Sequence, residues 1–396
     1  MPALRQSRLL GWVVKREERV AVGWRERLIC SIGPGLAVGM KCGDWVRLLA
    51  ANGFRVRPHR WPKAALATLF SLMQTPLSFL ERVLYDRRIA AEPIQPPIFV
   101  LGHWRSGTTL LHNLLAVDGR LAVPTVYEVV APHTFLLLEP MAPIGSFLLP
   151  STRLGVDNMA LSVGVPAEDE VALAVTTLLS PVVGFAFPER ADFYDRYLTF
   201  RDASCQEVDR WKSALVAFVR KLSWKYRRPL VLKSPGHTCR IKLLLEVFPE
   251  ARFVHIHRNP YVVYQSMMRL MAAVWGIYSF QRPPEPAAVH ARVIRQYRAM
   301  YEAFFEERDL IPAGRYFEVG FEAMEQDPLG EMARIYDGLS MPDFGVVRPA
   351  MEQYIRSLAG YHKNTHPDLP TEVLAEISRA WRRCFDAWGY PVENRG

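Results

Sequence analysis

The chain has 396 residues, of which half are apolar and 11% are aromatic, and it carries 49 basic against 40 acidic side chains. This composition supports a large buried core and excludes a disordered chain, a collagen-like chain and a small disulfide scaffold. The basic excess is confined to residues 1–90, which hold 16 Lys and Arg against 6 Asp and Glu. We therefore expect a basic appendage on a nearly neutral globular body, and no nucleic-acid partner. The five scattered cysteines form no CxxC pair, which predicts reduced thiols in a cytoplasmic protein and no metal site.

Residues 1–92 are expected to form a basic, helical N-terminal extension. Two uncharged runs, 64–80 and 171–188, lie at the lower edge of the length that crosses a bilayer, and each contains a proline. We therefore expect a buried or interfacial helix at 64–80. Basic residues lead directly into this run, which suits docking on an anionic membrane surface. The alternative is a helical cap that packs its apolar face on the core.

The Pro-bearing stretch 92–97 separates this extension from a domain over residues 93–396. Four short apolar, β-rich runs follow, and segments with helical periodicity separate them. The runs are Ile98–Gly102, Leu230–Lys233, Phe253–His257 and Tyr316–Val319. Apolar strands that alternate with helices indicate a parallel sheet covered on both faces. We therefore expect an α/β fold of three layers, P-loop-like, with its site at the C-terminal ends of the strands.

The first strand runs into a loop bounded by Gly102 and Gly107, and an apolar helix follows. Loop amides and the helix dipole together form a cradle for an anion. The spacing is that of a nucleotide P-loop, but Thr108 stands where a triphosphate-binding loop needs lysine, and the positive charge lies within the loop at Arg105. No aspartate follows the 253–257 strand. The pattern therefore favours a nucleotide whose transferred group needs no metal, over a P-loop kinase.

Two further strand ends carry cations. Lys233 ends its strand, so its ammonium is expected to project into the same crevice. Arg258 follows the next strand, and Asn259 and Pro260 are typical of a helix start. Ser266 lies eight residues after Arg258, about two helical turns, so both can face one side. This element predicts a receptor for a second phosphate.

The two phosphate-binding elements together resemble the sulfotransferase family, which uses 3′-phosphoadenylyl sulfate. Arg258 and Ser266 look like the motif for the 3′-phosphate of that donor. The loop for the 5′-phosphosulfate is matched by Arg105, Ser106, Gly107, Thr108 and Thr109. The resemblance runs from about residue 97 to 390 and is closest to the branch of tyrosylprotein and bacterial sulfotransferases, where the loop carries arginine. It implies transfer of a sulfuryl group to a hydroxyl, with Arg105 and Lys233 at the transferred group.

The base that takes the acceptor proton has several candidates. The resemblance points to Glu128, whose apolar neighbours should raise its pKa toward neutrality. Cytosolic members of the family use histidine, which makes His133 a second candidate. The run Glu168–Glu170 is a third, although acidic residues in a first helical turn commonly complement the helix dipole. His237, just past Lys233, is expected to cap or pack.

The resemblance also implies a C-terminal lysine over the 3′-phosphate, and Lys363 is the candidate. The basic N-terminal segment favours a hydrophobic or lipid-like hydroxyl acceptor and a cytoplasmic enzyme associated with a membrane. Two other functions remain open: a P-loop kinase-like phosphotransferase, and a non-catalytic peripheral membrane protein that keeps the fold. The sequence does not indicate an oligomeric state.

Overall fold

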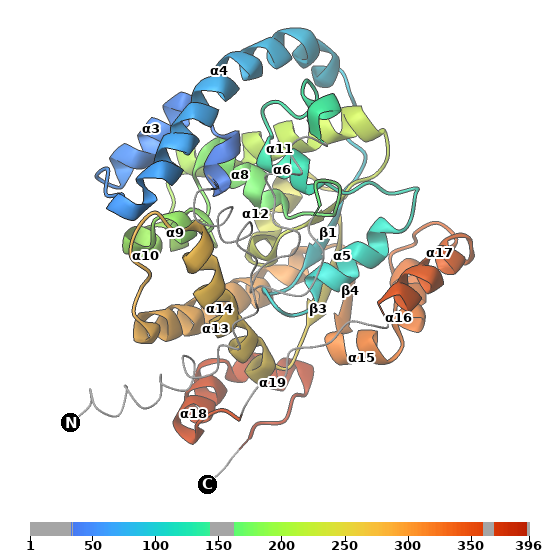
Figure 1. Cartoon of the computed structure of the whole chain (residues 1–396). Coiled ribbons are helices and arrows are strands. Elements are labelled where there is room, and N and C mark those ends of the chain that lie inside the picture. Colours follow the sequence, from blue (N-terminus) through green and yellow to red (C-terminus); the bar gives the residue numbers. More distant parts are fainter. Residues whose placement is uncertain (1–32, 34, 143–161, 359–367, 394–396) are drawn as a thin grey trace, which may run out of the picture.

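A parallel sheet of four strands forms the centre of the protein (Figure 1). The computed structural model describes residues 33, 35–142, 162–358 and 368–393. The sheet order is β2-β1-β3-β4, and every neighbouring pair is parallel. The strands are β1 (Ile98–Leu101), β2 (Val231–Lys233), β3 (Arg252–His257) and β4 (Tyr316–Gly320). The four apolar runs of the sequence are therefore the four strands, within a residue or two at each end.

Successive residues of β1 face opposite sides of the sheet, and both sides are covered by helices. Ile98 and Val100 pack in one apolar cluster, and Phe99 and Leu101 pack in another. Helices of the first cluster include α5 (Thr108–Ala116), α15 (Phe321–Gln326), α16 (Pro328–Gly338) and α17 (Phe344–Ser357). Helices of the second include α8 (Asp169–Thr177), α11 (Cys205–Tyr226), α13 (Pro260–Tyr278) and α14 (Pro286–Glu307). Figure 1 shows the two groups on opposite sides of the sheet, which confirms the three-layer α/β fold.

Six short helices among the described residues lie around this core. They are α6 (Val126–Val130), α9 (Val183–Ala186), α10 (Ala191–Asp195), α12 (Ile241–Val247), α18 (Thr371–Ala380) and α19 (Arg382–Trp388). Two 3-10 turns matter below, η1 (Gly35–Gly39) and η6 (Pro235–Cys239), and η6 directly follows β2.

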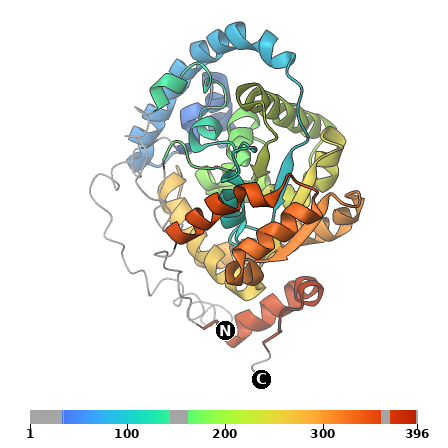
Figure 2. The same ribbon diagram turned by 90° about the vertical axis from the view of Figure 1, so that its right-hand side faces the viewer.

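The N-terminal region is helical, as expected. It contains α3 (Cys42–Ala51) and the long α4 (Trp61–Ala90), which lies along the outside of the molecule (Figure 2). Trp45 of α3 is fully buried, and its Nε1 donates to Thr68 Oγ1 of α4 at 2.9 Å. The uncharged run 171–188 is divided between α8 and α9. Within the described residues, no helix is long and apolar enough to cross a membrane.

Candidate functional site

The loop after β1 has the tight backbone of an anion cradle. Gly102 and Gly107 adopt φ values of +142° and +102°, which glycine tolerates better than other residues. A Cβ on Gly102 would lie 2.4 Å from the Ile256 carbonyl oxygen, and one on Gly107 would lie 2.3 Å from the ring of Phe321. The Gly102 amide donates to Thr238 Oγ1 at 2.7 Å. Close packing against β3, α15 and η6 therefore fixes the loop in front of the N-terminus of α5.

The structure brings together three of the predicted donor-binding residues. Arg105 Nε donates to Ser266 Oγ at 2.7 Å, so the loop after β1 contacts the second turn of α13. Arg258 Nη1 donates to the Arg105 carbonyl oxygen at 3.3 Å, and its guanidinium lies 4.1 Å from the centre of the Phe321 ring. Burial lowers the pKa of Arg258, and the nearby Arg105 charge acts in the same direction. Two cations held this close favour an anionic ligand between them.

The helix that carries Ser266 begins as the sequence predicts. Asn259 Oδ1 accepts from the Tyr261 amide at 3.0 Å, and Pro260 is the first helical residue. Ser106 and Thr108, two of the predicted loop residues, are buried, and Thr109 is half-buried. Ser106 Oγ donates to the His103 carbonyl oxygen at 2.8 Å, so this hydroxyl closes the loop on itself.

Lys233 lies at the C-terminal end of β2 and is almost completely buried. Its Nζ donates to Glu168 Oε1 at 2.7 Å. The Glu168 side chain is 28% exposed, whereas that of Lys233 is 2% exposed. One carboxylate oxygen is therefore held beside the lysine at the strand end, and the carboxylate is still partly accessible.

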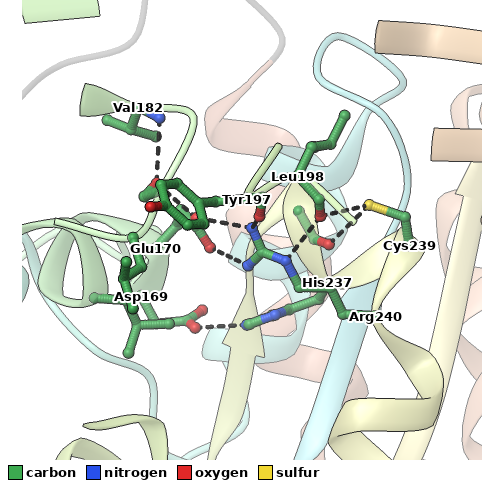
Figure 3. Close-up of polar contacts among 12 residues, drawn as sticks. Asp169, Glu170, Val182, Tyr197, Leu198, His237, Cys239 and Arg240 are labelled. Carbon is green, nitrogen blue, oxygen red and sulfur yellow. Dashed lines mark hydrogen bonds and ion pairs between the residues drawn. The ribbon is translucent and has the colours of Figure 1, made fainter. Parts of the chain in front are cut away.

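The two acidic residues after Glu168 also pair with the segment that follows Lys233. Asp169 Oδ2 lies 2.6 Å from His237 Nε2, and Glu170 accepts from both terminal nitrogens of Arg240, at 2.6 and 3.1 Å (Figure 3). All four side chains are buried. Burial opposes ionisation of Asp169, but the charge and hydrogen bond of His237 outweigh it, so the net pKa of Asp169 is lowered. We call residues 168–170 and their three basic partners, Lys233, His237 and Arg240, the acid clamp.

Glu128 lies in a different environment. It is fully buried, and its Oε2 accepts from the Thr125 amide at 2.7 Å and from Thr125 Oγ1 at 3.0 Å, in a capping box at the start of α6. Its Oε1 accepts from Lys225 Nζ at 2.8 Å and from Tyr226 OH at 2.7 Å. Both carboxylate oxygens are thus engaged, which fits a structural role.

His133 does not lie in the anion cradle or at the strand ends beside it. Burial, and then the charges of Lys41, Lys221 and Arg82, lower its pKa to about 3. The next residue, Thr134, bonds to Gln74 of α4, so this segment belongs to the packing of the N-terminal helices. Lys363 lies outside the described residues.

Sequence reasoning did not assign two contacts of the site. The hydroxyl of Thr238 holds the Gly102 amide, and Glu168 pairs with Lys233. For the second contact a signal was present: three consecutive acidic residues stand against a lysine, a histidine and an arginine at 233, 237 and 240. Chemically, the site offers an anion cradle, a second phosphate receptor, and a lysine and carboxylate pair beside them.

Comparison with known proteins agrees with this geometry. Residues 96–344 match the sulfotransferase family. The chain is 40% identical over 356 residues to omega-hydroxy-beta-dihydromenaquinone-9 sulfotransferase Stf3 of Mycobacterium bovis, which covers 90% of this chain and 91% of the relative, and the Stf3 of Mycobacterium tuberculosis matches equally.

Two solved structures share the fold. Sulfotransferase STF9 from Mycobacterium avium has a TM-score of 0.60 at 17% identity, covering 90% of this chain and 98% of that one. Sulfotransferase STF1 from Mycobacterium tuberculosis has a TM-score of 0.59 at 18% identity, covering 92% and 99%. The family match and the mycobacterial relatives, taken with the cradle and the strand-end cations, show that this chain belongs to the sulfotransferase family and is an enzyme that depends on 3′-phosphoadenylyl sulfate.

Proposed function

We propose that this enzyme transfers the sulfuryl group to the terminal hydroxyl of a long-chain isoprenoid quinone or a similar lipid. The observation that carries this acceptor class is the 40% identity, over nine-tenths of both chains, to enzymes named for omega-hydroxy-beta-dihydromenaquinone-9. A kinase-like reaction is disfavoured because Thr108 stands in the place of the P-loop lysine. A non-catalytic role is disfavoured by the retained pair of Lys233 and Glu168.

The donor fits the residues that are present. The loop amides and Arg105 suit the 5′-phosphosulfate, and Arg258 with Ser266 suits the 3′-phosphate, since these groups already lie within hydrogen-bond distance of one another. Lys363 remains a predicted contact to the same phosphate. The absence of a metal requirement also remains a prediction. It is supported by the positive charge that Arg105 and Arg258 already supply for the donor.

We assign the base to Glu168 and no longer to Glu128. A base needs a free carboxylate oxygen within reach of the acceptor hydroxyl. Glu168 is partly exposed and bonds through Oε1 to Lys233, whereas both oxygens of Glu128 accept bonds inside the fold. In the reaction, the acceptor oxygen bonds to sulfur as its proton passes to Glu168. The bond from sulfur to the phosphate oxygen breaks, and Lys233 stabilises the charge that develops on the leaving oxygen.

The family match also suggests how the chain is divided. We propose that residues 93–396 form the sulfotransferase domain and that 1–92 form an N-terminal extension, because the family match begins at residue 96. We propose that the enzyme is cytoplasmic, as the scattered, unpaired cysteines of the sequence favour, and that its lipid acceptor brings it to a membrane surface.

Transfer of labelled sulfate to a terminally hydroxylated isoprenoid quinone, with mass identification of the product, tests the function. The matched control is the same quinone without the hydroxyl, and EDTA is added to a parallel reaction. We expect product only from the hydroxylated lipid and no effect of EDTA. Transfer to small water-soluble alcohols or phenols, with none to the lipid, would refute the acceptor class and leave the donor assignment standing.

A further inference from the structure

Helix α4 is amphipathic, but its polar face is the one that points into the protein. The buried residues along α4 are Lys63, Ala67, Ser71, Gln74, Ser78 and Glu81. The large apolar residues that are exposed along it are Trp61, Leu69, Leu72, Met73, Phe79, Leu80, Val83 and Leu84. At about 100° per residue, the apolar set spans an arc of roughly 140° and the buried set lies on the opposite side. The helix is therefore turned outward relative to an ordinary surface helix.

Specific polar contacts fix this orientation. Lys63 Nζ donates to the Ile277 carbonyl oxygen at 2.6 Å, and Gln74 Oε1 accepts from Thr134 Oγ1 at 2.8 Å. Glu81 forms an ion pair with Lys221 and accepts from the Leu137 amide at 2.8 Å. Rotating the apolar face inward would break these bonds and leave buried partners, such as the Thr134 hydroxyl, without the hydrogen bond that they make to α4. The structure thus differs from a cap that packs its apolar face on the core.

The outward face is a concentrated patch. Among the described residues, fifteen large hydrophobic side chains are exposed, and eight of them belong to α4. Phe79 is 68% exposed and Leu72 is 54% exposed. Large contiguous apolar patches are uncommon on monomeric soluble proteins and mark sites of interaction. Both views show α4 at the periphery, with no other described helix over its outer side (Figures 1 and 2).

The charges around the patch indicate its partner. Residues 64–80 contain no charged side chain. The exposed residues Arg57, Arg87 and Arg88 lie at the two ends of the helix. Asp86 is the one exposed acid of α4, and it forms an ion pair with Arg82 at 3.2 Å, so these two charges offset each other. An apolar face with basic ends suits an anionic lipid surface, where each arginine adds to the attraction. A second copy of the chain suits it less, because parallel or antiparallel pairing of two such helices sets basic ends against basic ends.

We infer that α4 lies flat on an anionic lipid bilayer, with Leu72, Phe79 and their apolar neighbours inserted among the lipids. The helix does not cross the bilayer, in keeping with the absence of a spanning helix from the described residues. This inference deepens the proposed function, since it places the enzyme where a lipid acceptor is dissolved. The role of this docking in catalysis rests on the proposed function. Binding of α4 to the bilayer, by contrast, requires neither donor nor acceptor.

The test is sedimentation of the full chain with vesicles of phosphatidylcholine that contain phosphatidylglycerol, without nucleotide or quinone. The variant L72E/F79E introduces two charges into the centre of the face. The control L310E/V346E introduces the same charge at residues of matched exposure, 52% and 68%, elsewhere on the protein. We expect the α4 variant to lose at least about tenfold in vesicle affinity, which corresponds to about 1.4 kcal/mol, and the control to bind like the wild type.

Salt and lipid charge provide a second measurement. We expect binding to fall as ionic strength rises or phosphatidylglycerol is omitted, because the arginines at the helix ends act through a screened potential. Equal binding by L72E/F79E and the wild type, or no binding by the wild type, overturns the inference. The inference is also overturned if the wild type forms a dimer and does not bind vesicles, and if L72E/F79E, unlike the control, is monomeric. That result would assign the face to a second copy of the chain. Sulfation of the detergent-dispersed quinone by both variants, measured separately, shows whether the proposed function stands independently of docking.

Discussion

Replacement of Glu168 by glutamine separates the two candidate bases when it is compared with the same change at Glu128. In E168Q the amide oxygen can still accept from Lys233, so the side chain keeps its place but cannot take a proton. We expect turnover to fall and nucleotide binding to persist. In E128Q we expect the opposite pattern, a less stable protein whose folded fraction turns over normally.

The magnitudes follow from the contacts. Loss of a general base costs about 10²–10⁴ in rate, or roughly 3–5 kcal/mol in the barrier. The Glu168 side chain is partly exposed and bonds to the buried Lys233. Because the glutamine oxygen can still accept from Lys233, we expect its replacement to cost about 1–3 kcal/mol of stability. Glu128 accepts four hydrogen bonds. An amide nitrogen in place of one oxygen removes two of them, and bonds to a charged group are worth about 1.5–3 kcal/mol each. We therefore expect E128Q to lose roughly 3–6 kcal/mol.

Three measurements are needed on each variant. Transfer of labelled sulfate, normalised to folded protein, gives turnover, and calorimetry with adenosine 3′,5′-bisphosphate gives nucleotide affinity. Urea unfolding gives the free energy of unfolding. Near-normal turnover in E168Q would refute the assignment of the base, and a large loss of turnover in E128Q at unchanged stability would return the role to Glu128.

Three further outcomes are expected. R258A should weaken the binding of adenosine 3′,5′-bisphosphate by roughly 30-fold, or about 2 kcal/mol. In the same calorimetric measurement, the affinity for adenosine 5′-phosphate should be nearly unchanged, and equal losses of affinity for both nucleotides would contradict a 3′-phosphate site. G107A should abolish tight nucleotide binding, because its Cβ would lie 2.3 Å from Phe321 at a φ of +102°, whereas G119A, with nothing within 4 Å, should bind normally. Burial lowers the pKa of His103 to about 4. As the pH falls, the unfolded chain therefore protonates this histidine at a higher pH than the folded chain does. The contribution of His103 to the free energy of unfolding should thus be constant above pH 6.5 and fall by up to about 3 kcal/mol between pH 6.5 and 4. His133 and His257, whose pKa values burial also lowers, should add to this loss; a flat urea-unfolding profile from pH 7 to 5 would contradict this.

The strands, and the proximity of the proposed donor-binding residues to one another, were predictable because their signals are local. Each strand is a short apolar run bounded by polar residues, and burial on both faces requires such a run. Arg105 belongs to one loop, and Arg258 and Ser266 belong to one strand-to-helix junction. Parallel strands then bring their C-terminal ends to one edge of the sheet, so the topology itself placed these residues together.

The hydrogen-bond partners of the candidate bases were not predictable in the same way. Glu128 and its partners Lys225 and Tyr226 are almost a hundred positions apart in sequence, and no spacing rule predicts such a contact. The apolar neighbours of Glu128 suggested a raised pKa, but they are equally the surroundings of a buried carboxylate that is fully hydrogen-bonded. The orientation of α4 was not predictable for a related reason. The sequence shows that the helix has a polar face and an apolar face, but it does not show which of the two is buried.

In the proposed mechanism, the acid clamp divides two tasks among three adjacent residues. Asp169 and Glu170 are fully buried against His237 and Arg240, and removing one partner of a buried pair commonly costs about 3–5 kcal/mol. These two pairs fasten the start of α8 to the segment after β2. Glu168 stands at the exposed end of the run, where its position is fixed by its neighbours in the chain and not by its own bond to Lys233. It can therefore exchange Lys233 for an acceptor hydroxyl without loosening the helix, and that freedom is what a base at this site requires.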